Sequence, residues 1–318
     1  MDFSVVAVAR EDDSAVAEPV RVAFLADRLG YREVWAGEGP TWDAFVLAAA
    51  VGAATERVAV TAGPVPVNVR DPYTIARGAA SVAAVTGRAV GVALGTSSKR
   101  VVEGVHGRPR VRPAAVLEES AAALSGLLRG RVGEPVVPGS VFARRLPGPG
   151  GPLTVAAFGD RAIATAAAHA DRMLLDVVSP AQVRELRTKL DAAAEKAGRT
   201  RPTLAAWLPA AVDPDPASLA QVLGSIAGYL TVPGYREVFA EAGFAAAVEL
   251  AASGADRATL VRALPPEAAA TVGLVGDQAA VRARVDVYAE AGLDEIALVP
   301  ATAGDPAGER TLTALRPA

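Results

Sequence analysis

The sequence predicts an α/β fold in which eight parallel strands alternate with helices and close into a (β/α)₈ barrel. Short, continuously apolar runs recur along the chain, as expected for strands that are buried on both faces. Amphipathic helical patterns separate these runs. The same junction, a helix end followed by a glycine and an apolar run, occurs in "LADRLGYREVWA" (25–36) and "YAEAGLDEIALV" (288–299). An open, doubly wound sheet is the alternative arrangement of the same units.

Each predicted element follows from its local pattern. Gly30 and Gly292 fit the left-handed position that ends a helix, so each marks the turn before a buried strand. Strands are expected at residues 3–9, 32–36, 57–62, 89–94, 153–157, 171–175, 203–211 and 294–299. Helices are expected at 14–29, 43–54, 73–86, 112–129, 161–169 and 180–197, with several more between 217 and 291.

Two connections are much longer than the usual loop of about 4–6 residues. The first, 96–152, contains one helical pattern and the Gly/Pro-rich stretch "RLPGPGGP". The second, 212–293, contains several helical patterns. Both are interpreted as insertions, after strands 4 and 7, in a single domain that spans residues 1–318.

The composition excludes several classes of function. A net charge of −3 gives no basic excess for binding nucleic acid. The chain has no cysteine, which excludes disulfides, thiolate metal sites and cysteine nucleophiles, and His106 and His169 are too few for a multi-histidine metal centre. No metal is expected. Asp2 stands where a signal peptide would be positively charged, and no apolar run approaches ~20 residues, so we expect a cytoplasmic protein without a membrane span.

In a barrel of this kind, functional residues gather where the strands end. The strand ends here carry few reactive groups: Arg10; Gly37 and Glu38; Gly63 and Pro64; Thr96, Ser97 and Ser98; Phe158, Gly159 and Asp160; Asp176; Pro209; and Pro300. This scarcity indicates that a bound cofactor carries the chemistry. The junction Gly159-Asp160-Arg161 opens a helix, whose free N–H groups favour an anion. An ordinary capped turn is the alternative interpretation.

A series of segments resembles, in order, the luciferase-like monooxygenase superfamily, and within it the oxidoreductases that depend on the deazaflavin coenzyme F420. These segments are "LADRLGYREVWAGE", "DAFVLAAAVGAATERVAVTAGPVPVNVRDPYTIARGAASV", "GRAVGVALGTSS", "AAFGDRAIATAAAHADRMLL" and "VYAEAGLDEIALVP". The resemblance extends from residue 3 to residue 300. It implies a barrel of the bacterial-luciferase type, a small-molecule substrate, F420 as cofactor with FMN as the alternative, and a homodimer or larger homo-oligomer.

The resemblance also implies which residues contact the cofactor. Gly63, Pro64 and Val65 match a bulge in the third strand that backs the tricyclic ring and often contains a cis peptide. Gly95, Thr96 and Ser97 match the end of the fourth strand, where small residues let the cofactor side chain pass. Phe158, Gly159, Asp160 and Arg161 match the loop that meets the cofactor phosphate. Asp160 is itself acidic, so a capping or orienting role is expected for it.

The sequence departs from the F420 pattern after the second strand. Those enzymes commonly have Trp-x-x-Asp/Glu-His, whereas this chain has Trp35-Ala36-Gly37-Glu38-Gly39. Glu38 and His106 are therefore the candidate catalytic acids or bases, and Glu103 lies on the same loop as His106. Trp42 is a candidate wall of the substrate pocket. Each has a simpler interpretation: a solvated loop carboxylate for Glu38, a solvent-facing loop residue for His106 and a packing aromatic for Trp42.

Four functions are compatible with these patterns. The first is hydride transfer between F420 and a small organic substrate. The second is an FMN-dependent monooxygenase, and the third is a protein that binds a flavin-type ligand without turnover. A barrel lyase or isomerase without a redox cofactor rests on fold analogy alone. Because Gly39 replaces the histidine, we expect reduction of an activated double bond, or binding only, rather than a reaction that needs a strong proton donor on that loop.

Overall fold

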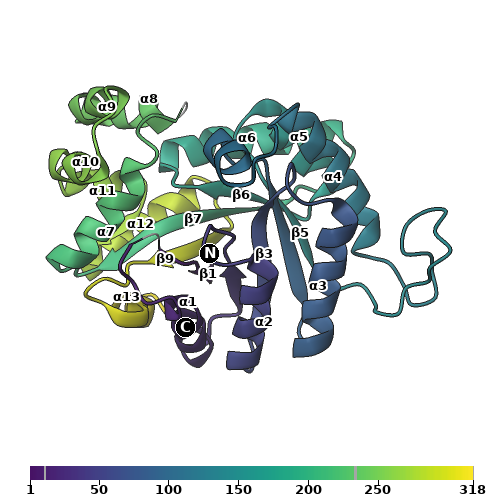
Figure 1. Ribbon diagram of the computed structural model, residues 1–318. Helices are drawn as coiled ribbons and strands as arrows, with labels where there is room; N and C mark the ends of the chain where they lie inside the picture. Colours follow the sequence, from purple (N-terminus) through teal and green to yellow (C-terminus); the bar gives the residue numbers. More distant parts are fainter. Residues whose placement is uncertain (11, 233–234, 318) are drawn as a thin grey trace.

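A computed structural model describes residues 1–10, 12–232 and 235–317, and in it the chain forms a closed barrel (Figure 1). The barrel strands are β1 (Asp2–Ala7), β2 (Glu33–Ala36), β3 (Ala59–Pro66), β4 (Val90–Gly95), β5 (Gly150–Ala156), β6 (Arg172–Asp176), β7 (Thr203–Val212) and β9 (Glu295–Pro300). All are parallel and neighbours pair in this order, with β9 closing on β1. The predicted barrel is confirmed, and the open sheet is wrong.

Helices cover the outside of the barrel. They are α1 (Glu18–Arg28), α2 (Ala44–Ala54), α3 (Pro72–Thr86), α4 (Pro113–Leu127), α5 (Asp160–His169), α6 (Pro180–Lys196) and α12 (Gln278–Glu290). Helix α1 begins at Glu18 rather than at residue 14. Pro19 lies in its first turn, where the missing proline N–H has no helical partner to lose. Among the described residues, no helix is long and apolar enough to cross a membrane.

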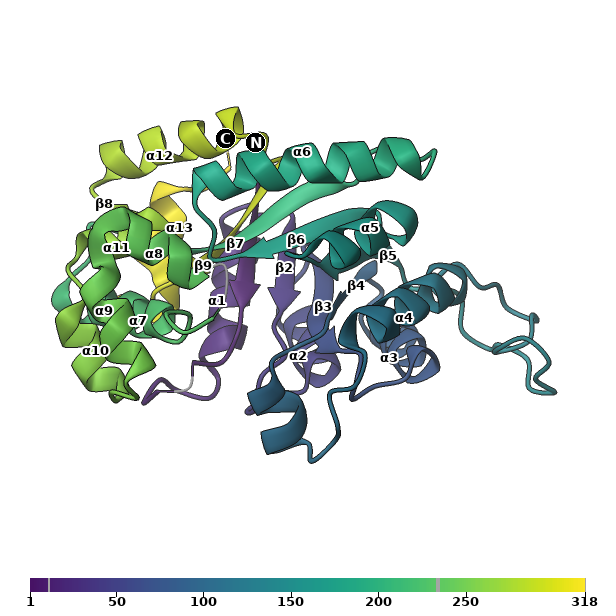
Figure 2. The same cartoon turned by 90° about the horizontal axis from the view of Figure 1, so that it is seen from above.

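The two predicted insertions lie on opposite sides of the barrel (Figures 1 and 2). After β4 come a short π-helix, η1 (Arg100–Val105), then α4 and a projecting loop. After β7 come α7 (Pro216–Ala227), α8 (Tyr235–Phe239), η2 (Ala240–Phe244), α9 (Ala245–Ala252), α10 (Arg257–Ala263) and α11 (Glu267–Thr271). These helices pack on the barrel through a second apolar cluster, which also includes Val177, Ala211 and Ala301. The chain ends in η3 (Pro306–Gly308) and α13 (Glu309–Ala314). Strand β8 (Leu274–Gly276), which pairs with β7, was not predicted, because three residues carry no readable period.

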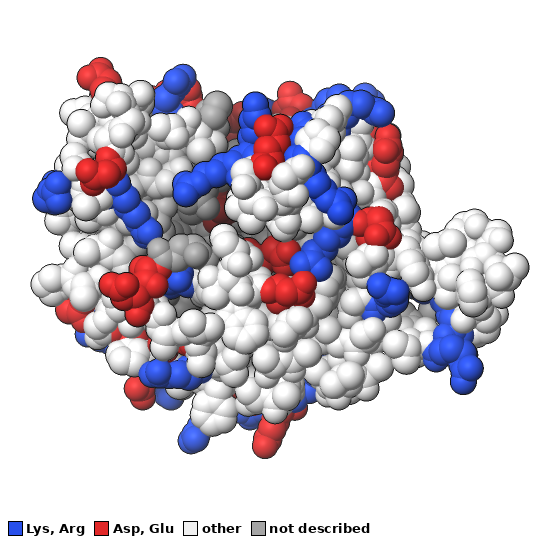
Figure 3. All heavy atoms as spheres, viewed as in Figure 1, with Lys and Arg blue, Asp and Glu red and all other residues white. Residues whose placement is uncertain are grey.

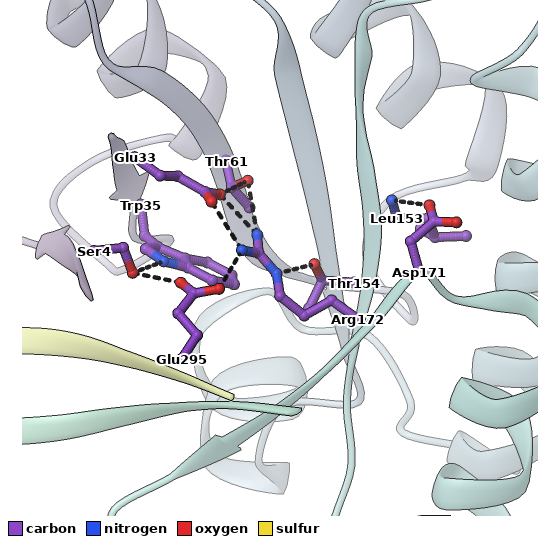
Figure 4. A network of polar contacts seen from close by, with 9 residues as sticks. All are labelled: Ser4, Glu33, Trp35, Thr61, Leu153, Thr154, Asp171, Arg172 and Glu295. Atoms are coloured by element: carbon purple, nitrogen blue, oxygen red, sulfur yellow. Dashed lines mark hydrogen bonds and ion pairs between the residues drawn. The ribbon is translucent and has the colours of Figure 1, made fainter. Parts of the chain in front are cut away.

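A buried polar network fills the N-terminal end of the barrel (Figure 4). The Arg172 guanidinium lies 2.7 Å from the carboxylates of both Glu33 and Glu295, and 4.0 Å above the ring of Trp35. Burial raises the pKa of the Glu295 carboxyl, and the Arg172 charge opposes that shift. Above this network an apolar layer fills the barrel, so the functional end is the opposite, C-terminal one.

Asp27 ties the end of α1 to the start of β3. Its buried carboxylate accepts hydrogen bonds from the backbone N–H groups of Glu56 (3.1 Å), Arg57 (2.8 Å) and Val58 (3.0 Å). Burial raises the pKa of this carboxyl, but the three N–H groups lower it by more, so the pKa lies below its ordinary value. The charged form is therefore the one that the fold stabilises.

Asp27→Asn is expected to lower the free energy of unfolding at pH 7 by about 1.5–3 kcal/mol, the range for hydrogen bonds to a charged group. A depressed folded pKa gives stability that is complete above the unfolded value of about 3.9 and is lost as the pH falls through the folded value. The difference from the wild type should therefore narrow in acid. Urea unfolding of both proteins at pH 7 and pH 3 measures it, and an equal difference at both pH values would contradict this account.

Candidate functional site

The predicted site residues lie at the C-terminal end of the barrel, which we call the mouth. Inside the barrel, Val6, Trp35, Ala93, Leu174, Ala205 and Ala297 form a buried layer. Val8, Ala156, Trp207 and Val299 pack on it from the mouth side and are only partly buried. On the face seen in Figure 3, positive and negative side chains are interspersed rather than segregated. The mouth thus has an apolar floor.

Two of the predicted cofactor contacts, the Gly63–Pro64 bulge of β3 and Gly95 of β4, lie side by side in one wall of the mouth. The Gly63–Pro64 peptide is cis, as the family resemblance implies, and the pairing with β4 shifts register between Ala62 and Val65. Val65 is fully buried beneath the bulge. Gly95 lies against it, because a Cβ at Gly95 would stand 3.3 Å from the Cβ of Pro64. The result is a stretch of bare backbone and a proline ring at the mouth.

Beyond Gly95, an arginine from the first insertion orders the end of β4. Arg110 donates to the Thr96 hydroxyl at 3.1 Å and to the Ser97 carbonyl at 2.9 Å. Ser97 has a positive φ of 53°. His106 is exposed at the end of η1, so the structure gives this candidate acid no fixed position over the mouth. Glu103 is paired with Lys99 at 3.5 Å.

The loop after β5 leaves a helix N-terminus without a side-chain cap. Gly159 is the N-cap residue of α5, and a Cβ built on it would meet nothing within 4 Å. Asp160 does not cap the helix; it pairs with Lys189 of α6 at 3.3 Å. The Arg161 side chain is exposed and has no ion pair among the described residues. Arg161 is therefore the cationic side chain of this junction that has no carboxylate partner among the described residues, since Lys189 pairs with both Asp160 and Glu185.

Glu38 and Trp42 are held in structural contacts. One Glu38 oxygen accepts from the backbone N–H of Ala44 at 2.7 Å, and the other pairs with Arg70 at 2.7 Å. Asp43 caps α2 and pairs with the same arginine at 2.6 Å. The Trp42 indole donates to the Val16 carbonyl at 3.0 Å. Glu38 thus fixes the start of α2, a role that the sequence analysis did not assign.

A second carboxyl, that of Asp176 at the end of β6, lies on the opposite wall. The Tyr229 hydroxyl donates to its carboxylate at 2.5 Å, and the Tyr235 hydroxyl to its backbone carbonyl at 2.6 Å. Tyr235 also packs on Phe158, with ring centroids 5.1 Å apart. Asp176 was noticed as a strand-end residue but given no role, and the two tyrosines come from the second insertion, where no motif marks them. This cluster is what the sequence analysis missed.

Arg10, which follows β1, links the end of that strand to the second insertion. Its guanidinium donates to the Ser225 hydroxyl at 3.4 Å and to the carbonyl of Pro300. Burial lowers the pKa of Arg10 to about 10, and Arg257 adds to this, while Asp12 opposes it. The arginine remains charged at neutral pH, so the mouth carries a fixed cation on the side of β1.

Solved structures share this architecture over nearly the whole chain. One is the coenzyme F420-dependent tetrahydromethanopterin reductase from Methanopyrus kandleri, with 17% identity and a TM-score of 0.81 over 99% of this chain and 97% of that chain. Another is an F420-dependent secondary alcohol dehydrogenase, with 17% identity and a TM-score of 0.76 over 99% of both chains. A third is the oxygenating constituent of 3,6-diketocamphane monooxygenase from Pseudomonas putida, in complex with FMN, with 15% identity and a TM-score of 0.68 over 99% of this chain and 96% of that chain.

At these identities the structures establish the fold. No curated protein sequence matches the chain. The family model described as luciferase-like monooxygenase matches residues 1–295, which include every barrel strand except the last five residues of β9. The match covers both predicted insertions and all the candidate site residues. The chain therefore belongs to the luciferase-like monooxygenase family, a family of oxidoreductases.

Proposed function

We propose that this protein is an oxidoreductase that transfers a hydride between a deazaflavin of the F420 type and a small organic substrate. The observation that carries the proposal is the wall of β3 and β4, where the Gly63–Pro64 bulge and Gly95 leave backbone and a proline ring at the mouth. A flat ring system can lie against such a wall, since no side chain projects from either glycine. The two F420-dependent structures also have higher TM-scores than the FMN-containing one.

The residues of the mouth fit such a cofactor in two further ways. The uncapped start of α5 and the free Arg161 offer N–H groups and a positive charge to a phosphate. Across the mouth, the buried Trp207 Nε1 has no hydrogen-bond partner among the described residues, so a donor is available to a ligand. A bound deazaflavin supplies the hydride, and the chain supplies position, orientation and a dry site.

Titration of the purified protein with F420 and with FMN, followed by fluorescence, tests the cofactor. We expect F420 to bind and FMN to bind much more weakly. FMN is the second candidate because the family contains monooxygenases. Preferential FMN binding with substrate-dependent oxygen consumption would replace the F420 proposal with that of a monooxygenase. Binding of neither would refute both.

Arg161→Ala is expected to weaken binding of the phosphate-bearing cofactor by about 1–3 kcal/mol, the range for hydrogen bonds to charged groups. Because the interaction is exposed, affinity should also fall as salt is added, and the variant should show less of this dependence. Fluorescence titration at two salt concentrations measures both effects. The matched control is Arg282→Ala, which removes an exposed arginine of α12. Equal affinities for Arg161→Ala and the control would mean that the β5–α5 junction is an ordinary turn that does not bind the phosphate.

A further inference from the structure

Asp176 occupies an inward-facing position at the mouth. Along β6, Arg172 and Leu174 both point into the barrel, where they join the polar network and the apolar layer. Because side chains alternate along a strand, Asp176, two residues further on, faces the same way. It is the last residue of β6, at the level of the mouth. Its carboxyl therefore belongs to the inner side of the strand and not to the helices outside.

The wall that holds Asp176 stands across the mouth from the β3 bulge. Asp176 is in register with Trp207 of β7, and β7 is four strands away from β3 in the order of the barrel. In a ring of eight strands, this is the opposite side. A ring system lying against Gly63–Pro64 would turn its free face toward Trp207 and Asp176. A substrate that accepts a hydride from that face would lie between the two walls.

Tyr229 and Tyr235, from the second insertion, donate hydrogen bonds to Asp176. Burial raises the pKa of Asp176 to about 6, and the hydrogen bond from Tyr229 opposes the shift. Tyr235 adds a ring 4.8 Å from that of Tyr229 and donates to the Asp176 carbonyl. Among the described residues, these tyrosines are the titratable side chains whose pKa values respond to Asp176. No cation pairs with the carboxyl in the described part of the chain, so its neutral form is accessible near pH 6.

We propose that Asp176 is the catalytic acid of this protein, with Tyr229 as its positioning residue, and that it donates the proton which a histidine at position 39 cannot donate here because that residue is glycine. This rests on the proposed function. Reduction of a C=C or C=O bond adds a hydride, which comes from the reduced cofactor, and a proton. The hydride leaves the electron pair of the broken π bond on the second atom. The Asp176 carboxylic acid protonates that atom and becomes a carboxylate, which Tyr229 stabilises and solvent reprotonates.

Carbon-13 NMR of protein labelled at the aspartate carboxyl carbons tests the inference without a known substrate. The Asp176 signal is assigned as the one lost in Asp176→Asn, and it is followed through a pH titration with and without one equivalent of F420. We expect titration near pH 6 and a change in the signal when F420 binds. Asp286, exposed on α12, provides a control signal, assigned from Asp286→Asn. If F420 binds by fluorescence but the Asp176 signal titrates near pH 4 and ignores the cofactor, this inference fails while the proposed function stands.

Turnover gives the second test, with 2-cyclohexen-1-one and further activated enones as probes and reduced F420 as donor. Where an enone is reduced, the wild-type kcat should fall above pH 6, because Asp176 then loses the proton that it donates. Asp176→Asn should lower kcat by roughly 10²–10⁴-fold and remove this pH dependence, while F420 affinity stays nearly intact. Tyr229→Phe removes a hydrogen bond that lowers the Asp176 pKa, so the fall should move to higher pH. Asp286→Asn and Tyr73→Phe are the controls. An Asp176→Asn variant with the wild-type rate and pH profile would overturn the inference.

Discussion

Arg172→Met is expected to lower the free energy of unfolding by about 3–5 kcal/mol, the cost of removing one partner from a buried ion pair. Arg172 is only 6% exposed at its side chain and neutralises Glu33 and Glu295 together. Methionine fills part of the space but leaves two carboxylates facing each other inside the barrel. Removal of the guanidinium also leaves the Trp35 ring without the cation above it.

Chemical denaturation at pH 7 measures this loss, with Arg129→Met as the matched control. Arg129 pairs with Asp171 at 3.3 Å, but its side chain is 63% exposed, so the control should cost under about 1 kcal/mol. At lower pH the Arg172→Met deficit should shrink, because burial raises the pKa of Glu295 and protonation of that carboxylate removes its repulsion with Glu33. A loss no larger than that of the control would mean that the network contributes little to stability.

Gly63→Ala is expected to abolish cofactor binding and to destabilise the fold. An unfavourable backbone conformation by itself costs about 1–3 kcal/mol, and the loss of stability here should be larger. Gly63 has a φ of 116°, which an L-residue rarely adopts. A Cβ there would also press on the Ala93 carbonyl and stand 2.6 Å from the Val65 nitrogen. The bulge would have to move away from β4, and the wall proposed for the cofactor ring would move with it.

Gly30→Ala separates the two contributions. Gly30 also has a positive φ, 88°, but a Cβ there meets nothing within 4 Å. Its variant therefore reports the backbone cost alone, and it should bind the cofactor like the wild type because Gly30 lies at the far end of α1. Thermal unfolding and fluorescence titration of both variants measure the difference. If Gly63→Ala were as stable as Gly30→Ala and still bound the cofactor, the close approach at the bulge would not matter.

The sequence by itself predicted the elements of the barrel and several features of its mouth. Each of these depends on neighbours in the chain. The glycine that ends a helix and the apolar run of a strand are local signals, and the cis Gly63–Pro64 peptide was implied by the family resemblance of that segment; all three lie where they were expected. The short strand β8 was missed because three residues carry too weak a local signal. The start of α1 was placed too early because the proline in its first turn, which marks the true start, was not taken into account.

The roles of the polar side chains were decided by the tertiary structure. Glu38 meets Arg70 across 32 positions, Asp176 meets Tyr229 across 53, and Arg172 meets Glu295 across 123. A carboxylate in sequence looks the same whether it will be paired, hydrogen-bonded or free. Its charge and reactivity depend on which distant groups barrel closure and the insertions bring to it, and on how much water they exclude. Glu38 was therefore selected as a candidate acid and is ion-paired with Arg70 in the structure, while Asp176, which no motif marks, places a partly buried carboxyl at the mouth.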